Sequence, residues 1–288
     1  MDQSSLESAL VDLNLSSIRY FPSIGSTNDE ALRWITAGAS DRALVIADEQ
    51  TAGRGRFHRH WVTPSGAALA FSLVLLSPPL DPKLFSRLAG LGALAVHTAL
   101  KQKYSLPVLI KWPNDVLIDD RKVAGILVEA HWTGEILSAV VIGIGINIAP
   151  ESVSEVRLPS TGLNFPVTCV ESALGHTVNR LELLHAILQE LLSWMPRLSL
   201  PDFIDEWEAN LAFRNQWVEL SLGNSGGDKQ PFFQAGDASA NTEVGKLVGL
   251  TSDGTLKLLT RSGKLVTASV GEIHLRPVPS HHSSLPPD

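Results

Sequence analysis

One segment near the middle of the chain most constrains its fold. Residues 84–104 carry apolar side chains at helical spacing, which predicts one long helix in the core. Four short strands are predicted after it, at 108–111, 115–118, 123–130 and 139–148. With the segments described below, this pattern predicts an α+β fold.

The segments on either side fit the same architecture. A helix is predicted to begin at Ser26-Thr27-Asn28, whose polar side chains can cap its first turn. Buried strands are predicted at 43–47 and 67–76. Two further helices are predicted at 181–195 and 201–213.

The character of the chain changes after about Gln216. Short alternating segments are joined there by Asp253-Gly254 and Ser262-Gly263, which are hairpin turn signals. They predict a small barrel of five or six strands, with a long polar hairpin loop at 224–241. The expected divisions are an N-terminal extension (1–19), a large domain (20–214), the barrel (215–277) and a disordered tail (278–288).

Charge and composition exclude several classes of function. The formal net charge is −7, so no broad surface for DNA or RNA is expected, and any anion site must be local. The single cysteine, Cys169, cannot form an internal disulfide. The longest apolar run, 139–149, is far shorter than the roughly 20 residues of a membrane-crossing helix, and residues 1–15 lack signal-peptide features. We therefore expect a cytoplasmic protein that binds neither nucleic acid nor membrane.

Positive charge is concentrated in one loop, Gln50-Thr51-Ala52-Gly53-Arg54-Gly55-Arg56-Phe57-His58-Arg59-His60-Trp61. Its glycines let backbone N–H groups approach an anion closely, and its arginines supply fork-shaped donors for carboxylate or phosphate. Such a loop suits a reaction that brings two anions together. From this loop alone, a solvated basic turn or a small nucleic-acid patch is an equal alternative.

Two further segments carry candidate functional residues. Lys111-Trp112-Pro113-Asn114-Asp115 sets two polar side chains at a bend fixed by proline, and Lys122 opens a buried strand soon after. Gly143-Ile144-Gly145-Ile146-Asn147 has glycine at every second strand position, which indicates close backbone approach or a ligand. Taken singly, an Asn-Asp pair is usually a turn, a lysine is usually solvated, and packing alone can explain the glycines.

Taken together and in this order, the segments resemble those of the biotin–protein ligase family. The shared motifs are Ser26-Thr27-Asn28, the Gly-Arg-Gly-Arg loop ending at Trp61, Lys-Trp-Pro-Asn-Asp, Arg-Lys-Val-Ala-Gly-Ile-Leu-Val-Glu and Gly-Ile-Gly-Ile-Asn-Ile. The resemblance extends from about residue 20 to the segment Gly271-Glu272-Ile273-His274-Leu275-Arg276-Pro277. It implies a mixed sheet flanked by helices, of the class II synthetase-like, biotin–lipoate ligase type, followed by a small SH3-like β-barrel.

The resemblance also implies an activity and a set of site residues. The activity is activation of biotin with ATP to biotinyl-5′-AMP, assisted by Mg²⁺, and transfer of biotin to a lysine of the biotin carboxyl carrier protein of a carboxylase. Such an enzyme would be a monomer or a homodimer. The implied biotin-binding residues are Ser26, Thr27, Asn28, Gln50, Gly53, Arg54, Arg56, Arg59, Trp61, Lys122 and Gly125. The implied nucleotide-binding residues are Arg56, Arg59, Trp61, Asn114, Lys122, Gly143, Gly145 and Asn147. The implied catalytic residues are Lys122, Arg56, Asp115 and Lys111, with Asp115 as a possible magnesium ligand.

The sequence departs from the family pattern at two places. His58 stands where the family loop usually has a second glycine, so the loop is expected to be stiffer or to close differently. The resemblance begins about 20 residues into the chain, so the DNA-binding domain of repressor-type relatives is not expected.

Three other functions compete with biotin ligation. A lipoate or octanoate ligase would need an apolar slot without the polar set Ser26, Thr27 and Gln50. A non-catalytic biotin sensor would not need Lys122 and Asp115. A nucleic-acid binder using the arginine loop is disfavoured by the acidic net charge.

Overall fold

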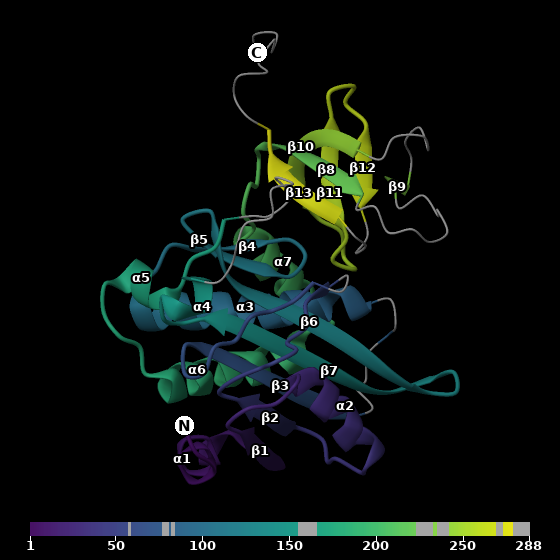
Figure 1. Cartoon of the computed structure of the whole chain (residues 1–288). Coiled ribbons are helices and arrows are strands. Elements are labelled where there is room, and N and C mark those ends of the chain that lie inside the picture. Colours follow the sequence, from purple (N-terminus) through teal and green to yellow (C-terminus); the bar gives the residue numbers. More distant parts are fainter. Residues whose placement is uncertain are drawn as a thin grey trace.

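The computed structural model describes residues 1–56, 59–76, 81, 84–154, 166–222, 233–234, 242–268 and 273–278. Two sheets organise the chain (Figure 1). The larger has seven strands in the order β1-β2-β3-β7-β6-β5-β4, and only β1 and β2 run parallel. The predicted mixed sheet flanked by helices is confirmed. Its strands are β1 (Ser17–Phe21), β2 (Ala43–Ala47), β3 (Ala68–Leu76), β4 (Val108–Lys111), β5 (Asp115–Ile118), β6 (Arg121–Thr133) and β7 (Ile136–Asn147).

The helices divide between the two faces of this sheet. Helix α3 packs against the face that carries the even-numbered residues of β7, because a side chain at Gly92 of α3 would meet Ile126 and Ile142. Helix α2 packs on the other face, where Ala31 joins a small cluster with Val141. The alternation of side chains along a strand therefore separates a core face from a second face on which the candidate site is built. The helices are α1 (Gln3–Ala9), η1 (Val11–Leu13), α2 (Thr27–Thr36), α3 (Phe85–Tyr104), α4 (Glu151–Ser154), α5 (Val170–Leu174), α6 (Arg180–Trp194), η4 (Met195–Arg197) and α7 (Pro201–Ala209).

The start of α2 is determined locally. Ser26 is the N-cap residue, with extended backbone angles, and its side chain accepts a hydrogen bond from the backbone N–H of Asp29. This capping arrangement is the one that Ser26-Thr27-Asn28 predicts. It also buries Thr27 and Asn28 on one face of the sheet, so the cap places polar side chains against the central strands β3 and β7.

The C-terminal strands form a second, antiparallel sheet in the order β13-β8-β10-β11-β12-β9. Its strands are β8 (Trp217–Leu222), β9 (Phe233–Gln234), β10 (Thr242–Leu250), β11 (Leu256–Thr260), β12 (Leu265–Ala268) and β13 (Ile273–Pro277). No pairing between the edge strands β9 and β13 is present among the described residues, so the closed barrel predicted here is not confirmed. The predicted loop at 224–241 contains the short strand β9, which pairs with β12; the rest of that loop and residues 279–288 of the predicted tail lie outside the described residues.

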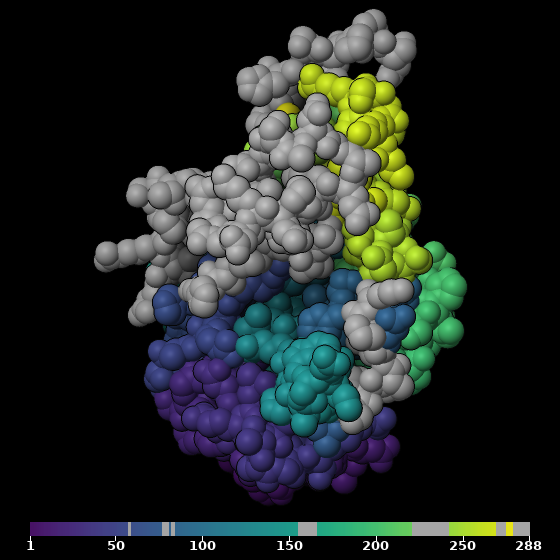
Figure 2. All heavy atoms as spheres, turned by 90° about the vertical axis from the view of Figure 1, so that its right-hand side faces the viewer, coloured from purple at the N-terminus to yellow at the C-terminus, as the bar shows by residue number. Residues whose placement is uncertain are grey.

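The smaller sheet contacts the larger unit through the turn at residues 251–255, between β10 and β11, and through β10, where the Leu250 N–H donates to Glu208 Oε2 of α7 at 2.7 Å. In Figures 1 and 2 the smaller sheet, in green and yellow, stands above the larger unit close to α7. Buried Arg87 of α3 donates to the carbonyl oxygen of Ser252, and Trp112 Nε1 donates to the carbonyl oxygen of Gly254 at 3.0 Å. The first bond, which is partly buried, holds the turn against α3, and the second, which is buried, holds it against the segment between β4 and β5.

Gly254→Ala is expected to destabilise the protein more than Gly263→Ala. Both glycines have positive φ, +86° and +76°, so both substitutions carry backbone strain of roughly 1–3 kcal/mol. Only at Gly254 would the added Cβ meet a neighbour, Trp207 Cζ3 at 2.9 Å; nothing lies within 4 Å at Gly263. Calorimetric melting of both variants measures the difference, which should be about 1 kcal/mol or more; equal melting temperatures would contradict the docking described here.

Among the described residues, no helix combines the length and the apolar character needed to cross a membrane. Two large apolar side chains are exposed near the tip of the β6–β7 hairpin, Trp132 and Ile136. This hairpin, in teal, projects away from the body of the larger unit (Figures 1 and 2).

Candidate active site

The floor of the candidate site is a track of glycines on β6 and β7. Gly143 and Gly145 share the face of β7 covered by α2, and Gly125 pairs with Gly145 across the sheet. A Cβ at Gly143 would lie 2.0 Å from Asn28 Oδ1, and one at Gly145 would lie 2.5 Å from the Trp61 ring. Real Cβ atoms do not approach so closely, so these glycines are required where Asn28 and Trp61 lie on the sheet.

At the Gly143 end of the track lies a buried polar set. The side chains of Ser26, Thr27 and Asn28 are 2%, 4% and 4% exposed, so their hydrogen bonds must be made inside the protein or to a ligand. Gln50 Oε1 accepts from the backbone N–H of Thr27 at 2.8 Å, and Gln50 Nε2 donates to Thr63 at 3.2 Å. The structure thus brings together Ser26, Thr27, Asn28 and Gln50, four of the residues that the resemblance implies for biotin binding.

The arginine loop folds back on itself as a short hairpin. Trp61 N–H donates to the Gly53 carbonyl oxygen at 2.9 Å, and Gly55 N–H donates to that of Arg59 at 2.7 Å. A Cβ at Gly53 would lie 2.3 Å from the Trp61 carbonyl oxygen, so this close approach requires glycine. The hairpin sets Trp61 on the track; the expectation for His58 lies outside the described residues.

The side chains of the loop point to different parts of the site. Arg54 Nη2 lies 2.6 Å from Asp29 Oδ1 and 2.6 Å from Glu129 Oε2, on the α2 side. Arg56 instead donates to Asn114 Oδ1 at 2.9 Å. The two arginines are therefore anchored to different elements, one to α2 and β6 and the other to the segment between β4 and β5.

Charged groups gather at the Gly125 end of the track. Lys122 Nζ lies 2.6 Å from Asp115 Oδ1 and 5.4 Å from the centroid of the Trp61 ring, a cation–π distance. Burial acts to raise the pKa of Asp115, but the positive charges of Lys122 and Lys111 outweigh it, and the pKa lies below its ordinary value of 3.8. Asp115 is therefore an anion at neutral pH and a weak proton acceptor.

Lys111 lies in the same charged group. Burial lowers its pKa, the carboxylate of Asp115 opposes this shift, and the charge of Lys122 adds to it; the resulting pKa is about 8. Arg276 of β13 also acts electrostatically on Lys111, and its Nη2 is buried without a hydrogen-bond partner in the described part of the chain. The smaller sheet thus contributes a cation to the site that we did not predict, although Arg276 stands in the terminal segment included in the resemblance.

Asn147, one of the residues predicted to bind the nucleotide, is the last residue of β7. Asn147 is buried, and its Nδ2 donates to the Thr168 carbonyl oxygen at 3.0 Å, which ties the segment after residue 166 to the end of β7.

In the described ranges, no three His, Cys, Asp or Glu side chains lie close enough together to hold a metal ion. Magnesium commonly binds through ATP phosphates and only one or two carboxylates, and Asp115, whose Oδ1 pairs with Lys122, is the carboxylate placed among the lysines of this site.

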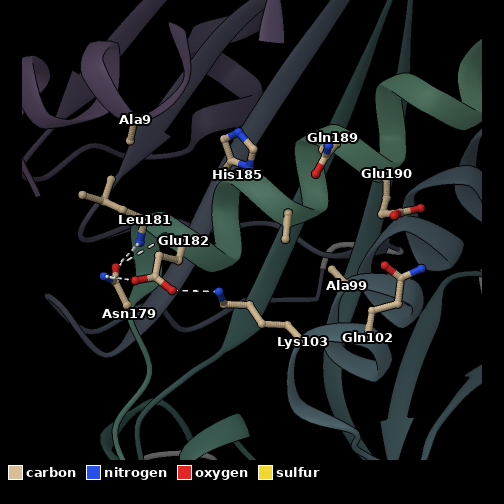
Figure 3. Close-up of a pocket in the computed structure, with 11 residues that line it drawn as sticks. Ala9, Ala99, Gln102, Lys103, Asn179, Leu181, Glu182, His185, Gln189 and Glu190 are labelled. Atoms are coloured by element: carbon tan, nitrogen blue, oxygen red, sulfur yellow. Dashed lines mark hydrogen bonds and ion pairs between the residues drawn. The ribbon is translucent and has the colours of Figure 1, made fainter. Parts of the chain in front are cut away.

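A surface cavity of about 590 Å³ lies apart from this site, between α1, α3 and α6 (Figure 3). Four of the polar side chains that line it, those of Lys103, Asn179, Glu182 and His185, pair with one another or with a neighbouring element. Lys103 Nζ lies 2.7 Å from Glu182, and His185 Nε2 lies 3.0 Å from Asp12. We therefore place the chemistry at the glycine track.

Comparison with known proteins adds independent information. A model of the biotin/lipoate A/B protein ligase family matches residues 20–147. The biotin–[acetyl-CoA-carboxylase] ligase of Paracoccus denitrificans is 37% identical over 195 residues, covering 67% of this chain and 76% of that protein. The bifunctional ligase/repressor BirA of Escherichia coli is 32% identical over 270 residues, covering 93% of this chain and 76% of that protein.

Solved structures agree with these matches. The biotin protein ligase from Aquifex aeolicus, in complex with biotin and ATP, is similar with a TM-score of 0.70 and 27% sequence identity, covering 92% of this chain and 100% of that one. A biotin protein ligase from Leishmania major, 21% identical, shares the fold with a TM-score of 0.59.

Proposed function

This chain belongs to the biotin/lipoate A/B protein ligase family, and we propose that it is a biotin–protein ligase that forms biotinyl-5′-AMP from biotin and ATP and then transfers biotin to a lysine of a carrier protein. The observation that carries the proposal is the order of groups along the glycine track. A buried polar set lies over Gly143, an indole lies over Gly145, and lysines with a carboxylate lie beyond Gly125. This order suits a ligand with a polar ring at one end and a carboxylate at the other.

In the first step, a carboxylate oxygen of biotin attacks the α-phosphorus of ATP, and pyrophosphate leaves with the electron pair of the broken P–O bond. Both reactants are anions, so their approach needs fixed positive charge. Lys122 would hold the biotin carboxylate and the α-phosphate, and Lys111 and Arg56 would neutralise the charge that develops as the bond forms. The ion pair with Asp115 keeps the Lys122 ammonium in place before the substrates arrive.

In the second step, the amine of the carrier lysine attacks the carbonyl carbon of the mixed anhydride, and AMP leaves. The low pKa of Asp115 makes it a poor base, so its role would be to attract and orient the incoming amine. Water must be kept from the anhydride until the carrier binds. Trp61, together with the short hairpin that carries Arg56, would form the cover.

The substrate acid can be distinguished from that of the related lipoate and octanoate ligases. A ureido ring presents two N–H donors and a carbonyl acceptor, and the buried hydroxyls of Thr27 and Ser26 with the half-buried amide of Gln50 can satisfy them. Lipoate and octanoate have no polar ring, so any of these groups that turns toward the acid would lack a partner there, at a cost of about 1–3 kcal/mol for each such group. Biotin is therefore the proposed acid.

The role of the smaller sheet is a further part of the proposal. We propose that it is an SH3-like barrel that closes over ATP, because β13 brings Arg276 into electrostatic contact with Lys111. The turn at 251–255 binds Trp112, which is the immediate neighbour of Lys111. This bond would keep the separation between Arg276 and Lys111 constant. Cytoplasmic location belongs to the same proposal, since the reaction consumes ATP.

The direct test is exchange of labelled pyrophosphate into ATP by the purified protein with Mg²⁺ and a single acid. Exchange with biotin is expected, and exchange with lipoate or octanoate is not. Adding a biotin carboxyl carrier domain should then give a carrier heavier by one biotinyl group in mass spectrometry. Exchange that depends on lipoate or octanoate would refute biotin as the substrate, and no exchange with any acid would refute the enzyme.

The rate of adenylate formation is expected to fall as the pH rises through about 8. The ammonium of Lys111 is present below its pKa of about 8 and lost above it, so its positive charge disappears in that range. The pH profile of kcat/KM reports the free enzyme and is measured on the adenylation half-reaction alone. Lys111→Arg should move the decline to higher pH, because a guanidinium stays protonated; an unmoved decline would exclude Lys111 as its origin.

A further inference from the structure

The side chain of Asn114, at the turn between β4 and β5, is bonded to the protein through both ends of its amide. Its Nδ2 donates to the Ile126 carbonyl oxygen at 2.9 Å, and its backbone carbonyl oxygen accepts from the Ile126 N–H at 2.9 Å. Its Oδ1 accepts from Arg56 Nη1 at 2.9 Å. A carbonyl oxygen only accepts and a guanidinium only donates, so each partner alone fixes the same orientation of the amide. Asn114 therefore presents a fixed acceptor to the arginine loop.

The bond to Asn114 holds Arg56 beside the charged group of the candidate site. Asn114 immediately precedes Asp115, whose Oδ1 lies 2.6 Å from Lys122 Nζ. Burial acts to raise the pKa of Asp115, and Arg56 is one of the cations whose charge lowers it. Arg56 is thus held where the carboxylate of biotin and the α-phosphate of ATP are proposed to meet.

Arg54 shows that the loop does not send every arginine to the reaction centre. It stands two positions before Arg56, yet its Nη2 lies 2.6 Å from Asp29 Oδ1 and 2.6 Å from Glu129 Oε2. Because the two arginine side chains are chemically identical, the backbone of the loop and the acceptors near each guanidinium must decide where it lies. For Arg56, Asn114 is such an acceptor.

We propose that Asn114 is a positioning residue that directs Arg56 to the reaction centre of adenylation, and that it contributes to the reaction through Arg56 rather than through a bond to ATP. The inference rests on the proposed function, because it names adenylation as the step. The resemblance implies nucleotide binding for Asn114. With one amide proton given to Ile126 and the amide oxygen bonded to Arg56, the side chain is instead suited to hold the loop on β6.

The first test is Asn114→Ala, measured by the maximal rate of pyrophosphate exchange and by the KM for ATP at saturating biotin. We expect the maximal rate to fall by roughly a hundredfold, since Arg56 loses an acceptor that holds it and a misplacement of about 1 Å can cost this much. The KM for ATP should stay within about twofold of the wild type, because Arg56 is proposed to act on charge that develops in the transition state. Direct binding of ATP by Asn114 would raise this KM, and a merely structural role would lower the melting temperature without changing the rate of the folded enzyme.

A double-variant series tests whether the effect passes through Arg56. Adding Asn114→Ala to Arg56→Ala should lower the maximal rate by no more than about twofold, because the group that Asn114 positions is already absent. Arg54→Ala is the matched background, since it removes the other arginine, whose described partners are Asp29 and Glu129. In that background, adding Asn114→Ala should again cost roughly a hundredfold.

Asn114→Asp separates the bond to Arg56 from the bond to Ile126, and it serves if Asn114→Ala does not fold. Aspartate keeps an acceptor for Arg56 but has no donor for the Ile126 carbonyl oxygen. Its maximal rate should therefore stay within about tenfold of the wild type, measured at saturating ATP to offset repulsion of ATP by the new carboxylate.

Four results would each overturn the inference. They are an unchanged maximal rate in Asn114→Ala, a raised KM for ATP in that variant, a full further loss when Asn114→Ala is added to Arg56→Ala, and a rate in Asn114→Asp as low as the rate expected for Asn114→Ala. Wild-type protein that gives no exchange with biotin would overturn the proposed function itself, and the wild-type assay shows this before any variant is compared.

Discussion

Replacing Lys122 by alanine is expected to lower the rate of biotinyl-adenylate formation by roughly a thousandfold, the effect of removing one preorganised charge-stabilising donor from a shielded site. The Lys122 ammonium lies 2.6 Å from Asp115 and over the Trp61 ring. The substitution therefore removes the cation proposed to hold both reacting anions. Single-turnover formation of biotinyl-5′-AMP is the measurement, because it isolates this step from transfer and product release.

Two controls separate chemistry from stability. Lys103→Ala removes a lysine with a comparable ion pair, 2.7 Å from Glu182, but beside the cavity of Figure 3, and should leave the rate unchanged. Lys122→Ala also leaves Asp115 without its partner, which is destabilising in itself. Adding Asp115→Asn should recover thermal stability without recovering adenylation. A rate within tenfold of the wild type in Lys122→Ala would remove this residue from the mechanism.

The second large effect is expected from Gly145→Ala, which should weaken biotin binding by roughly a hundredfold. The added Cβ would lie 2.5 Å from Trp61 Cε2 and Nε1, so the indole must move off the track. The backbone of Trp61 is fixed, because its backbone N–H donates to the Gly53 carbonyl oxygen at 2.9 Å, so the ring can leave the track only by rotating about its side-chain bonds. A displacement of about 1 Å in a site of this kind can cost about 10²-fold in activity.

Matched substitutions make this prediction specific. Gly25→Ala adds the same methyl group near the start of α2, where nothing lies within 4 Å, and should bind biotin as the wild type does. Trp61→Phe in the Gly145→Ala background should recover part of the affinity, because the smaller ring leaves room for the Cβ. Calorimetric titration with biotin gives both results; full affinity in Gly145→Ala alone would show that the indole is not held on the track.

Local pattern was a reliable guide to the secondary structure. The helix predicted at 84–104 is α3 (Phe85–Tyr104), and the start of α2 is capped by Ser26, as its polar run predicts. The β6–β7 hairpin extends further than predicted, to Thr133 and from Ile136, because its tip carries exposed apolar residues that break the alternation. Alternation identifies only the part of a strand that has one buried face.

The candidate site was predicted unevenly for a related reason. Motifs of adjacent residues identified Lys122, Asp115 and the glycines, because each motif carries its own local signal. Glu129 was part of a quoted motif but had no predicted role, since nothing near it in the sequence points to Asn28, 101 residues away. Arg276 was missed as a site residue because its proximity to Lys111 depends on how the smaller sheet docks.

The sequence by itself determined the helices and strands of this protein and the residues whose side chains can bind a ligand or react. The reason is that helical period, strand alternation, caps and turns act between residues a few positions apart. Only the tertiary structure decided which of those residues meet. The order β3-β7-β6-β5 places Asn28 over Gly143 and Lys122 beside Asp115, and a turn 142 residues away binds Trp112. These contacts depend on sheet order and docking, which are set by the burial of the whole core and leave no local signature in the chain.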